Sequence, residues 1–325
     1  MSKIIFFAHD PGGANALAPL IAPLSVEHAV FVFAGGPALS MLPGAEELPK
    51  NALKTIRPDF LITGTSGNDK TEKQLWPEAR SLNIKSMAIL DHWVNYGIRF
   101  SKWGLREIGE YGTIGKPDIF PDYISVMDEF AKGEMIKEGI PEKIIFPLGN
   151  PHFEAILNRE NTSRKKTGQK YVITFASEPY SEDYGRGYEK EVLRDLIEFS
   201  KDKDIELIVK LHPKENISKY KEFADEATLD TTTPARDIIL RSDLVVSMTS
   251  MFLIEAYILN RRILSYQPHE QDSSKFILTR NKTLPFLNNK QDFFEHLDSK
   301  QPLSRHWDIS FDGIKNNIKF INEVL

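Results

Sequence analysis

Short apolar runs alternate with helical patterns along both halves of the chain, and this alternation limits the fold more than any other feature. Runs of this kind, rich in β-branched and aromatic residues, are typical of buried strands. Strands that alternate with helices predict an α/β fold with a parallel sheet covered on both faces. The expected strands are 4–8, 28–34, 60–63, 85–90, 123–127 and 143–147 in the first half, and 171–176, 205–211, 243–246 and 262–266 in the second.

A domain boundary is expected near Gly149-Asn150-Pro151-His152, which follows a strand and precedes a helix. The polar run that comes next, up to residue 170, is typical of a solvated connector. The length of 325 residues suits two domains of about 150 residues each. We therefore expect domains at residues 1–150 and 151–325, with the option that the last helix packs back on the first domain.

Residues 92–122 interrupt the alternation and combine several aromatic residues with glycines. A long connection of this kind is usually either functional or disordered, and this one is too aromatic for a plain linker. We expect it to contact the acceptor of a reaction, and closure over the site or a role in a dimer interface stay open as alternatives.

Composition excludes several classes of protein. The net charge of −5 argues against nucleic acid as the main partner, because nucleic-acid binding normally needs a basic surface. The chain has no cysteine, so disulfides and thiolate metal sites are excluded and a reducing cytoplasm is compatible. No apolar run reaches the length of about 18 residues that a membrane span needs. We expect a cytoplasmic protein, and peripheral attachment to the inner face of a membrane stays open.

The first strand ends in a glycine turn that leads into a helix. Such a turn can bind phosphate, although this one lacks both the full dinucleotide pattern and the lysine of a P-loop. Asp10 lies at the strand end, where a general base could sit, and the alternative is a tight turn in which Asp10 caps the helix. The candidate acceptor or phosphate loop comprises Pro11, Gly12, Gly13 and Asn15.

A second candidate pair, Asp91 and His92, follows the strand 85–90. A carboxylate and an imidazole at a strand end could do acid–base work. Adjacent residues of an extended chain point to opposite sides, however, so the two need not act together. The alternative is a turn beside a buried Trp93.

Two motifs mark strand ends in the second half. His212 and Pro213 follow the strand 205–211, where the histidine could donate to a phosphate or a base edge. The stretch 242–256 then predicts a strand, a hydroxyl-rich turn and a helix, with Thr249 or Ser250 as the N-cap. Free N–H groups and the helix dipole make such a turn an anion site. The alternatives are a solvated strand end and an ordinary capped helix with Glu255 on its wet side.

Metal and serine-hydrolase chemistry are not indicated. No cluster of His, Asp and Glu has convincing metal spacing, and the Gly-x-Ser-x-Gly pattern is absent. We therefore expect no metal and no cofactor.

The motifs KLHP (210–213) and SMTSMFLIEA (247–256) are similar to the His-Pro and Ser-x-x-Ser motifs of bacterial polysialyltransferases, capsule Kdo transferases and CDP-glycerol glycerophosphotransferases. RPDFLITG (57–64) and PLGNPHFEAIL (147–157) resemble segments of the wider two-domain group, which includes UDP-GlcNAc 2-epimerases. The resemblance implies the GT-B fold, with two Rossmann-like domains whose parallel sheets face a central cleft. It also implies that the two motifs bind a cytidine nucleotide.

Carried onto this sequence, the resemblance gives each motif residue a role. His212 and Pro213 would contact the nucleotide, and Ser247, Thr249 and Ser250 belong to the motif that binds its phosphate. Glu255 would bond the ribose. The leading hypothesis is an inverting, metal-independent glycosyltransferase of surface-polysaccharide synthesis, with a CMP- or CDP-linked donor, a carbohydrate acceptor and Asp10 or Asp91 as the base. The alternatives are a UDP-sugar epimerase or hydrolase and a non-catalytic nucleotide-sugar-binding subunit. The donor base and sugar, the acceptor and the oligomeric state stay open.

Overall fold

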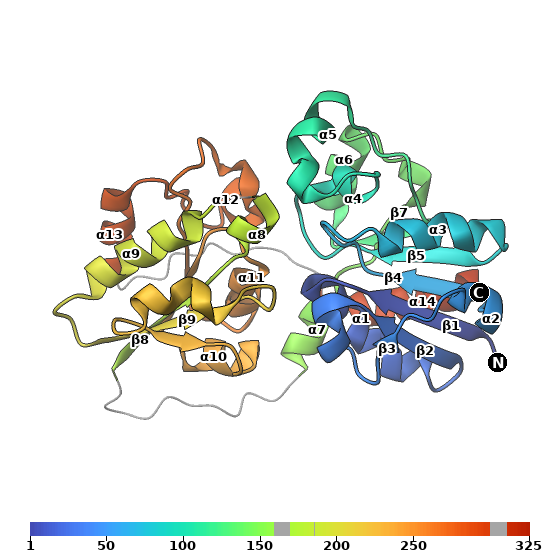
Figure 1. Cartoon of the computed structure of the whole chain (residues 1–325), viewed down its shortest axis with the longest axis horizontal. Helices are drawn as coiled ribbons and strands as arrows, with labels where there is room; N and C mark the ends of the chain where they lie inside the picture. The colour runs from blue at the N-terminus through green and yellow to red at the C-terminus, as the bar shows by residue number, and fades with distance from the viewer. Residues whose placement is uncertain (159–169, 185, 300–310) are drawn as a thin grey trace. The chain divides into compact units, whose positions relative to one another are not determined.

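The computed structural model describes residues 1–158, 170–184, 186–299 and 311–325. The chain forms two compact units (Figure 1). The first comprises Met1–Ala155 and Ile309–Leu325, and the second comprises Ile156–Asp308. The division falls inside helix α7 (Pro151–Leu157). None of the described helices is long and apolar enough to cross a bilayer.

The first unit is built on a parallel sheet of seven strands in the order β3-β2-β1-β4-β5-β6-β7. Its core strands are the predicted ones to within a few residues, and the short edge strand β3 carries too little apolar sequence to be predicted. The strands are β1 Lys3–Ala8, β2 Ala29–Ala34, β3 Glu46–Glu47, β4 Phe60–Thr63, β5 Lys85–Ile89, β6 Tyr123–Val126 and β7 Ile145–Pro147. The helices are α1 Pro11–Leu24, α2 Ala52–Ile56, α3 Thr71–Ser81, α4 Tyr96–Arg99, α5 Ile108–Ile114, α6 Glu129–Lys137 and α14 Gly313–Val324.

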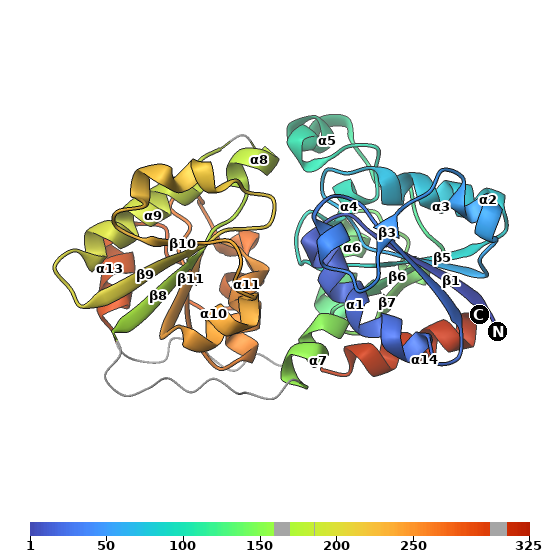
Figure 2. The same cartoon turned by 60° about the horizontal axis from the view of Figure 1, so that its bottom comes forward.

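Helices cover both faces of this sheet because alternate residues of each central strand are buried on opposite sides. Phe6 and Ile62 are register partners, and both lie in the core that α1 and α14 complete. Thr63 points to the other face, where its hydroxyl accepts a hydrogen bond from Trp76 of α3 at 2.9 Å. Figure 2 shows α14 beside α1, so the end of the chain packs on the first unit.

The segment 92–122 is ordered and largely folded, so the alternative of a disordered connection is wrong. It contains α4 and α5, and its aromatic residues Trp93, Tyr96 and Phe100 are buried. The indole of Trp93 donates to Asp128 at 2.9 Å, at the N-cap of α6. These aromatic side chains therefore serve the core of the first unit.

The second unit repeats the same architecture on a parallel sheet of five strands in the order β10-β9-β8-β11-β12. The strands are β8 Tyr171–Ala176, β9 Ile205–Lys210, β10 Thr228–Asp230, β11 Leu244–Ser247 and β12 Arg262–Ser265. The helices are α8 Tyr180–Tyr184, α9 Tyr188–Ser200, α10 Ala235–Arg241, α11 Met251–Ile258, α12 Ile277–Arg280 and α13 Lys290–Asp298. Helix α8 lies in the connection between β8 and α9.

Both sheets reverse their strand order once, and this fixes where ligands can be recognised. The order runs outward from β1 to β2 and from β4 to β5 in the first unit, and from β8 to β9 and from β11 to β12 in the second. Ligands of open parallel sheets bind at the carboxyl ends of the strands beside such a reversal. The loops after β1, β4, β8 and β11 are therefore the places to search.

Candidate functional site

In the first unit, Asp10 occupies the N-cap position of α1 but does not cap that helix with its side chain. Its carboxylate turns to the neighbouring loop, where Oδ2 accepts the backbone N–H of Gly67 at 3.0 Å. Its Oδ1 lies 3.0 Å from Nδ1 of His9. The alternative in which Asp10 only caps its helix is therefore wrong, because the carboxylate joins the loops after β1 and β4.

His9 is a residue that the sequence did not single out. Its bond to Asp10 places the proton of a neutral ring on Nδ1 and leaves the lone pair on Nε2. Oδ2 of Asp69 lies 3.7 Å from Nε2. The hydrogen bond to Asp10, opposed by burial and helped by the charge of Asp69, raises the pKa of His9 above its usual value. A histidine oriented by a carboxylate is a common arrangement for a general base.

Asp91 reaches the same loop from the end of β5. Its Oδ1 lies 3.2 Å from Nη1 of Arg99 and 3.5 Å from the hydroxyl of Thr65. Arg99 also donates to the carbonyl oxygen of Thr65. Asp10 and Asp91 thus hold the loop after β4 from opposite sides. His92, the third predicted catalytic residue, is half-buried beside Asp91.

The glycine turn makes room for these contacts. A Cβ at Gly12 would stand 1.7 Å from Oδ2 of Asp91, and a Cβ at Gly13 would stand 3.2 Å from Cα of Gly64. The carboxylate of Asp91 therefore lies against the first turn of α1, where the helix dipole favours an anion. Pro11 is buried at the start of the helix, and Asn15 is half-buried further along. The space that a phosphate could use at Gly12 is thus occupied by a side chain of the protein.

Glu72 of α3 also contacts the loop after β4. Its Oε2 accepts the backbone N–H of Ser66 at 2.6 Å, and the side chain is only 1% exposed. Among the described residues, its Oε1 has no hydrogen-bond partner. Burial raises the pKa of Glu72 to about 7, although the bond from Ser66 acts in the other direction. Ser66 and Gly67 thus offer consecutive N–H groups to two carboxylates.

In the second unit, the predicted hydroxyl turn between β11 and α11 has Ser250 as its N-cap. The Ser250 hydroxyl oxygen accepts the N–H of Phe252 at 3.2 Å, which confirms the predicted cap. Ser247 and Thr249 are buried instead of facing solvent. Glu255 is also buried, at 9% exposure, so the alternative that places it on the wet side of the helix is wrong.

A carboxylate that the sequence did not single out fills the centre of this turn. Oε1 of Glu178 accepts the N–H of Met248 at 2.9 Å, the N–H of Thr249 at 2.6 Å and the hydroxyl of Ser247 at 2.9 Å. Its Oε2 accepts the Thr249 hydroxyl at 2.6 Å. Burial raises the pKa of Glu178, and the bonds from Thr249 and Ser247 counteract that effect.

His212 lies in a tight turn after β9, and Pro213 follows it at the surface. Its Nδ1 accepts the N–H of Lys214 at 3.1 Å, so the proton of the neutral ring lies on Nε2. Its backbone N–H donates to Oε2 of Glu215 at 2.8 Å. Oε1 of Glu215 accepts the hydroxyl of Ser177 at 2.9 Å. Because Ser177 and Glu178 are neighbours after β8, consecutive residues hold the two predicted motifs.

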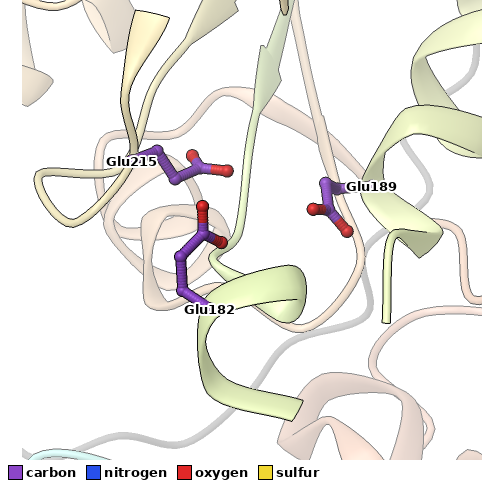
Figure 3. A group of neighbouring side chains, drawn as sticks. All are labelled: Glu182, Glu189 and Glu215. Atoms are coloured by element: carbon purple, nitrogen blue, oxygen red, sulfur yellow. The ribbon is translucent and has the colours of Figure 1, made fainter. Parts of the chain in front are cut away.

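Three glutamates meet beside this turn (Figure 3). Glu182, Glu189 and Glu215 each offer an oxygen within 4.8 Å of the others, which is close enough to share a cation. The ammonium of Lys219 meets that need, because it lies 3.0 Å from Glu182, 2.6 Å from Glu215 and in contact with Glu189. This arrangement ties α8 and α9 to the His212 turn, and the protein's own lysine supplies its positive charge.

Comparisons with known proteins bear on both the fold and the second unit. The family model described as alpha-2,8-polysialyltransferase matches residues 130–265, a range that includes His212, Pro213 and the hydroxyl turn. No curated protein matches the chain.

Solved structures match the chain over its full length. The Staphylococcus aureus MnaA–UDP structure has a TM-score of 0.72 at 14% identity, over 100% of this chain and 98% of that one. UDP-GlcNAc 2-epimerase from Neisseria meningitidis bound to UDP-GlcNAc has a TM-score of 0.70 at 14% identity, over 99% of both chains. Anabaena HepE with UDP-glucose has a TM-score of 0.57 at 12% identity, over 98% of this chain and 94% of that one. The chain has the GT-B fold. Its two parallel sheets are those of two Rossmann-like units.

Proposed function

We propose that the protein is an inverting glycosyltransferase that uses a nucleotide-activated donor, linked to CMP or CDP. The match of residues 130–265 to the polysialyltransferase family carries the proposal. The structure supports it, because the two motifs inside that range follow β9 and β11, which flank β8 in the sheet. The hydroxyl turn therefore stands beside the reversal of strand order, where an α/β sheet binds its ligand, and the His212 turn lies one strand away, next to β8.

The second unit would bind the donor. The Nε2–H of His212 is a donor that suits a phosphate or a base edge, and the N-terminus of α11 offers backbone N–H groups and a positive dipole end. Both would stabilise the negative charge that grows on the phosphate as the sugar leaves. Pro213 would contact the nucleotide, and Glu255 would bond the ribose.

The first unit would bind and activate the acceptor. A base removes the proton of the acceptor hydroxyl, whose oxygen attacks the anomeric carbon while the bond from that carbon to the phosphate oxygen breaks. Attack in line with that bond inverts the configuration of the sugar. Asp10, which orients the ring of His9, is favoured over Asp91, whose Oδ1 is paired with the cation Arg99. No metal takes part in this scheme, which would serve surface-polysaccharide synthesis at the inner face of the membrane.

A second candidate function is a UDP-sugar epimerase or hydrolase. It is favoured by the likeness to the Neisseria meningitidis epimerase bound to UDP-GlcNAc and to the MnaA–UDP structure. Such an enzyme converts its sugar nucleotide without an acceptor. Turnover of a donor measured with and without acceptor separates the two functions, because a transferase needs the acceptor for its full rate.

Nucleotide binding tests the site on which both functions depend. Thermal-shift and calorimetric titrations with CMP, CDP, UMP, UDP and GDP should find at least one ligand, since saturation at 100 times the Kd stabilises a protein by about 2.7 kcal/mol. The variant His212→Ala should lose this binding. His296→Ala is the matched control in the same unit, because the His296 ring bonds the carbonyl oxygen of Asp292 in its own helix. Unchanged affinity in His212→Ala for every nucleotide would refute the assignment.

A further inference from the structure

Glu178 takes the hydrogen-bond donors that a phosphate would be expected to use in the second unit. Strand–turn–helix segments bind anions through the backbone N–H groups and hydroxyls of the turn. Here Met248, Thr249 and Ser247 give four such bonds to one carboxylate. The side chain is 7% exposed, so it is part of the interior.

The backbone N–H groups that Glu178 does not accept belong to the next two residues of the chain. Ser250 uses its hydroxyl oxygen to cap α11, and within the described part of the chain the N–H groups of Ser250 and Met251 make no hydrogen bond. Ser250 is half-buried, whereas Thr249 is 8% exposed. The first N–H groups of a helix carry much of its positive end charge. A phosphate that reaches this turn would therefore meet Ser250 and Met251 and not Thr249.

We propose that Glu178 is a positioning residue of the donor site: it locks the turn from the inside, and the donor phosphate binds the N–H groups of Ser250 and Met251. This inference rests on the proposed donor site at α11 and changes the role of Thr249. The Thr249 hydroxyl holds Glu178 and does not touch the phosphate. The turn depends on Glu178, because removing it would leave three buried donors without an acceptor, namely the N–H groups of Met248 and Thr249 and the Thr249 hydroxyl.

Met251 allows a clean test of the phosphate contact. It is the first residue of α11, a position that accepts proline, and Ser250 before it has φ −65° and ψ 141°, which suits a residue that precedes proline. Met251→Pro therefore removes one N–H while the helix is kept. We expect the Kd of the best-binding nucleotide to rise about tenfold, the usual effect of one hydrogen bond to a charged group.

Thr249→Val is the matched comparison, because it removes the hydroxyl at nearly constant volume and keeps the N–H that Glu178 accepts. Its Kd should rise less than that of Met251→Pro, because Glu178 keeps its bonds from the N–H groups of Met248 and Thr249. Glu178→Ala should raise the Kd at least about tenfold by releasing the turn. Glu178→Gln should restore most of the affinity, because its amide oxygen can still accept the backbone N–H groups of Met248 and Thr249. Unfolding temperatures without ligand, measured for each variant, separate loss of binding from loss of fold.

Three outcomes would overturn the role of Glu178. They are a loss in Thr249→Val as large as that in Met251→Pro, tighter binding by Glu178→Gln than by the wild type, and unchanged binding by Met251→Pro. Tighter binding would mean that the carboxylate competes with the phosphate and leaves when the donor binds. Wild-type protein that binds no nucleotide at all would instead refute the proposed function, and the phosphate site with it. The Met251 and Thr249 variants decide the question even if Glu178→Ala does not fold.

Discussion

Asp91 in the first unit and Glu178 in the second show how differently one arrangement can be used. Each carboxylate follows a strand of its parallel sheet, β5 for Asp91 and β8 for Glu178, and lies against the turn that starts a helix. Asp91 shares its charge with a cation, Arg99, at 3.2 Å. Glu178 is held by four neutral donors and by no cation at hydrogen-bond distance among the described residues.

Asp91 and Glu178 also differ in the side chains that surround them. Around Asp91 the loop brings together Asp10, His9 and Glu72, of which His9 keeps 28% of its side chain exposed. Several titratable groups that share one loop can exchange protons with a substrate. Around Glu178 the partners are hydroxyls and backbone N–H groups, which hold an anion in place and do not titrate. This difference is what we expect if, as proposed, the first unit transfers the proton and the second binds the donor phosphate.

The largest expected effect tests this division at Asp10. Asp10→Asn removes the carboxylate that orients His9, so the rate of transfer should fall about 10²–10⁴-fold, the usual contribution of a general base. The Kd of the nucleotide should stay the same, because the donor binds the other unit. Asp59→Asn is the control. Asp59 lies in the same unit at the amino ends of the central strands, where it accepts the N–H of Lys3. A transfer rate unchanged in Asp10→Asn would break the comparison.

A second prediction concerns stability. Glu178→Ala leaves three buried donors, the N–H groups of Met248 and Thr249 and the Thr249 hydroxyl, without their acceptor and should destabilise the second unit by about 3–5 kcal/mol. Asp91→Ala should cost about 1–2 kcal/mol, because Arg99 keeps its bond to the carbonyl oxygen of Thr65.

Hydrogen exchange resolved by peptide measures both variants, since it reports each unit separately. Glu178→Ala should lose protection in β11 and α11, and Asp91→Ala in the loop after β4. Equal losses of protection in the two variants would show that the two carboxylates stabilise their units to the same extent.

The sequence predicts the frame of both units better than their polar interior. Apolar runs locate β1, β4, β8 and β11, and the rule that ligands meet strand ends then selects Asp10, Asp91, His212 and the hydroxyl turn. Local chemistry also predicts the cap at Ser250. These features depend on neighbours in the chain, and a single sequence displays them directly.

Contacts between loops that are far apart in the sequence cannot be predicted from such local patterns. Glu178 bonds to Thr249, 71 residues away, and Arg99 bonds to Thr65, 34 residues away. In the sequence, Glu178 stands in a polar stretch that looks solvated, and Glu72 looks like an exposed residue in the first turn of a helix. Only the order of the strands shows that β8 lies between β9 and β11, and this order lets Ser177 reach the His212 turn through Glu215 while Glu178 reaches the hydroxyl turn.

The last prediction uses Glu72, which is as buried as Glu178 but has a backbone N–H from Ser66 in place of four donors. Its pKa of about 7 lies above its ordinary value of 4.5. The folded state therefore holds the proton more tightly than the unfolded state. The resulting stability is present in full below about pH 4.5 and is lost as the pH rises through about 7. Because the pKa of Glu72 in the folded state lies well above its ordinary value, the loss of folding stability amounts to about 3 kcal/mol at most.

Glu72→Gln should remove this slope, because an amide does not titrate in that range. The free energy of unfolding of the variant relative to the wild type should rise between pH 5 and pH 8. Tryptophan fluorescence follows mainly the first unit, since three of the four tryptophans, Trp76, Trp93 and Trp103, lie there. The raised pKa of His9 gives a slope of the same sign in both proteins. Glu78→Gln, in the same helix, should leave the slope unchanged. A difference that does not depend on pH would mean that Glu72 is ionised in the folded protein and that its partners fully offset its burial.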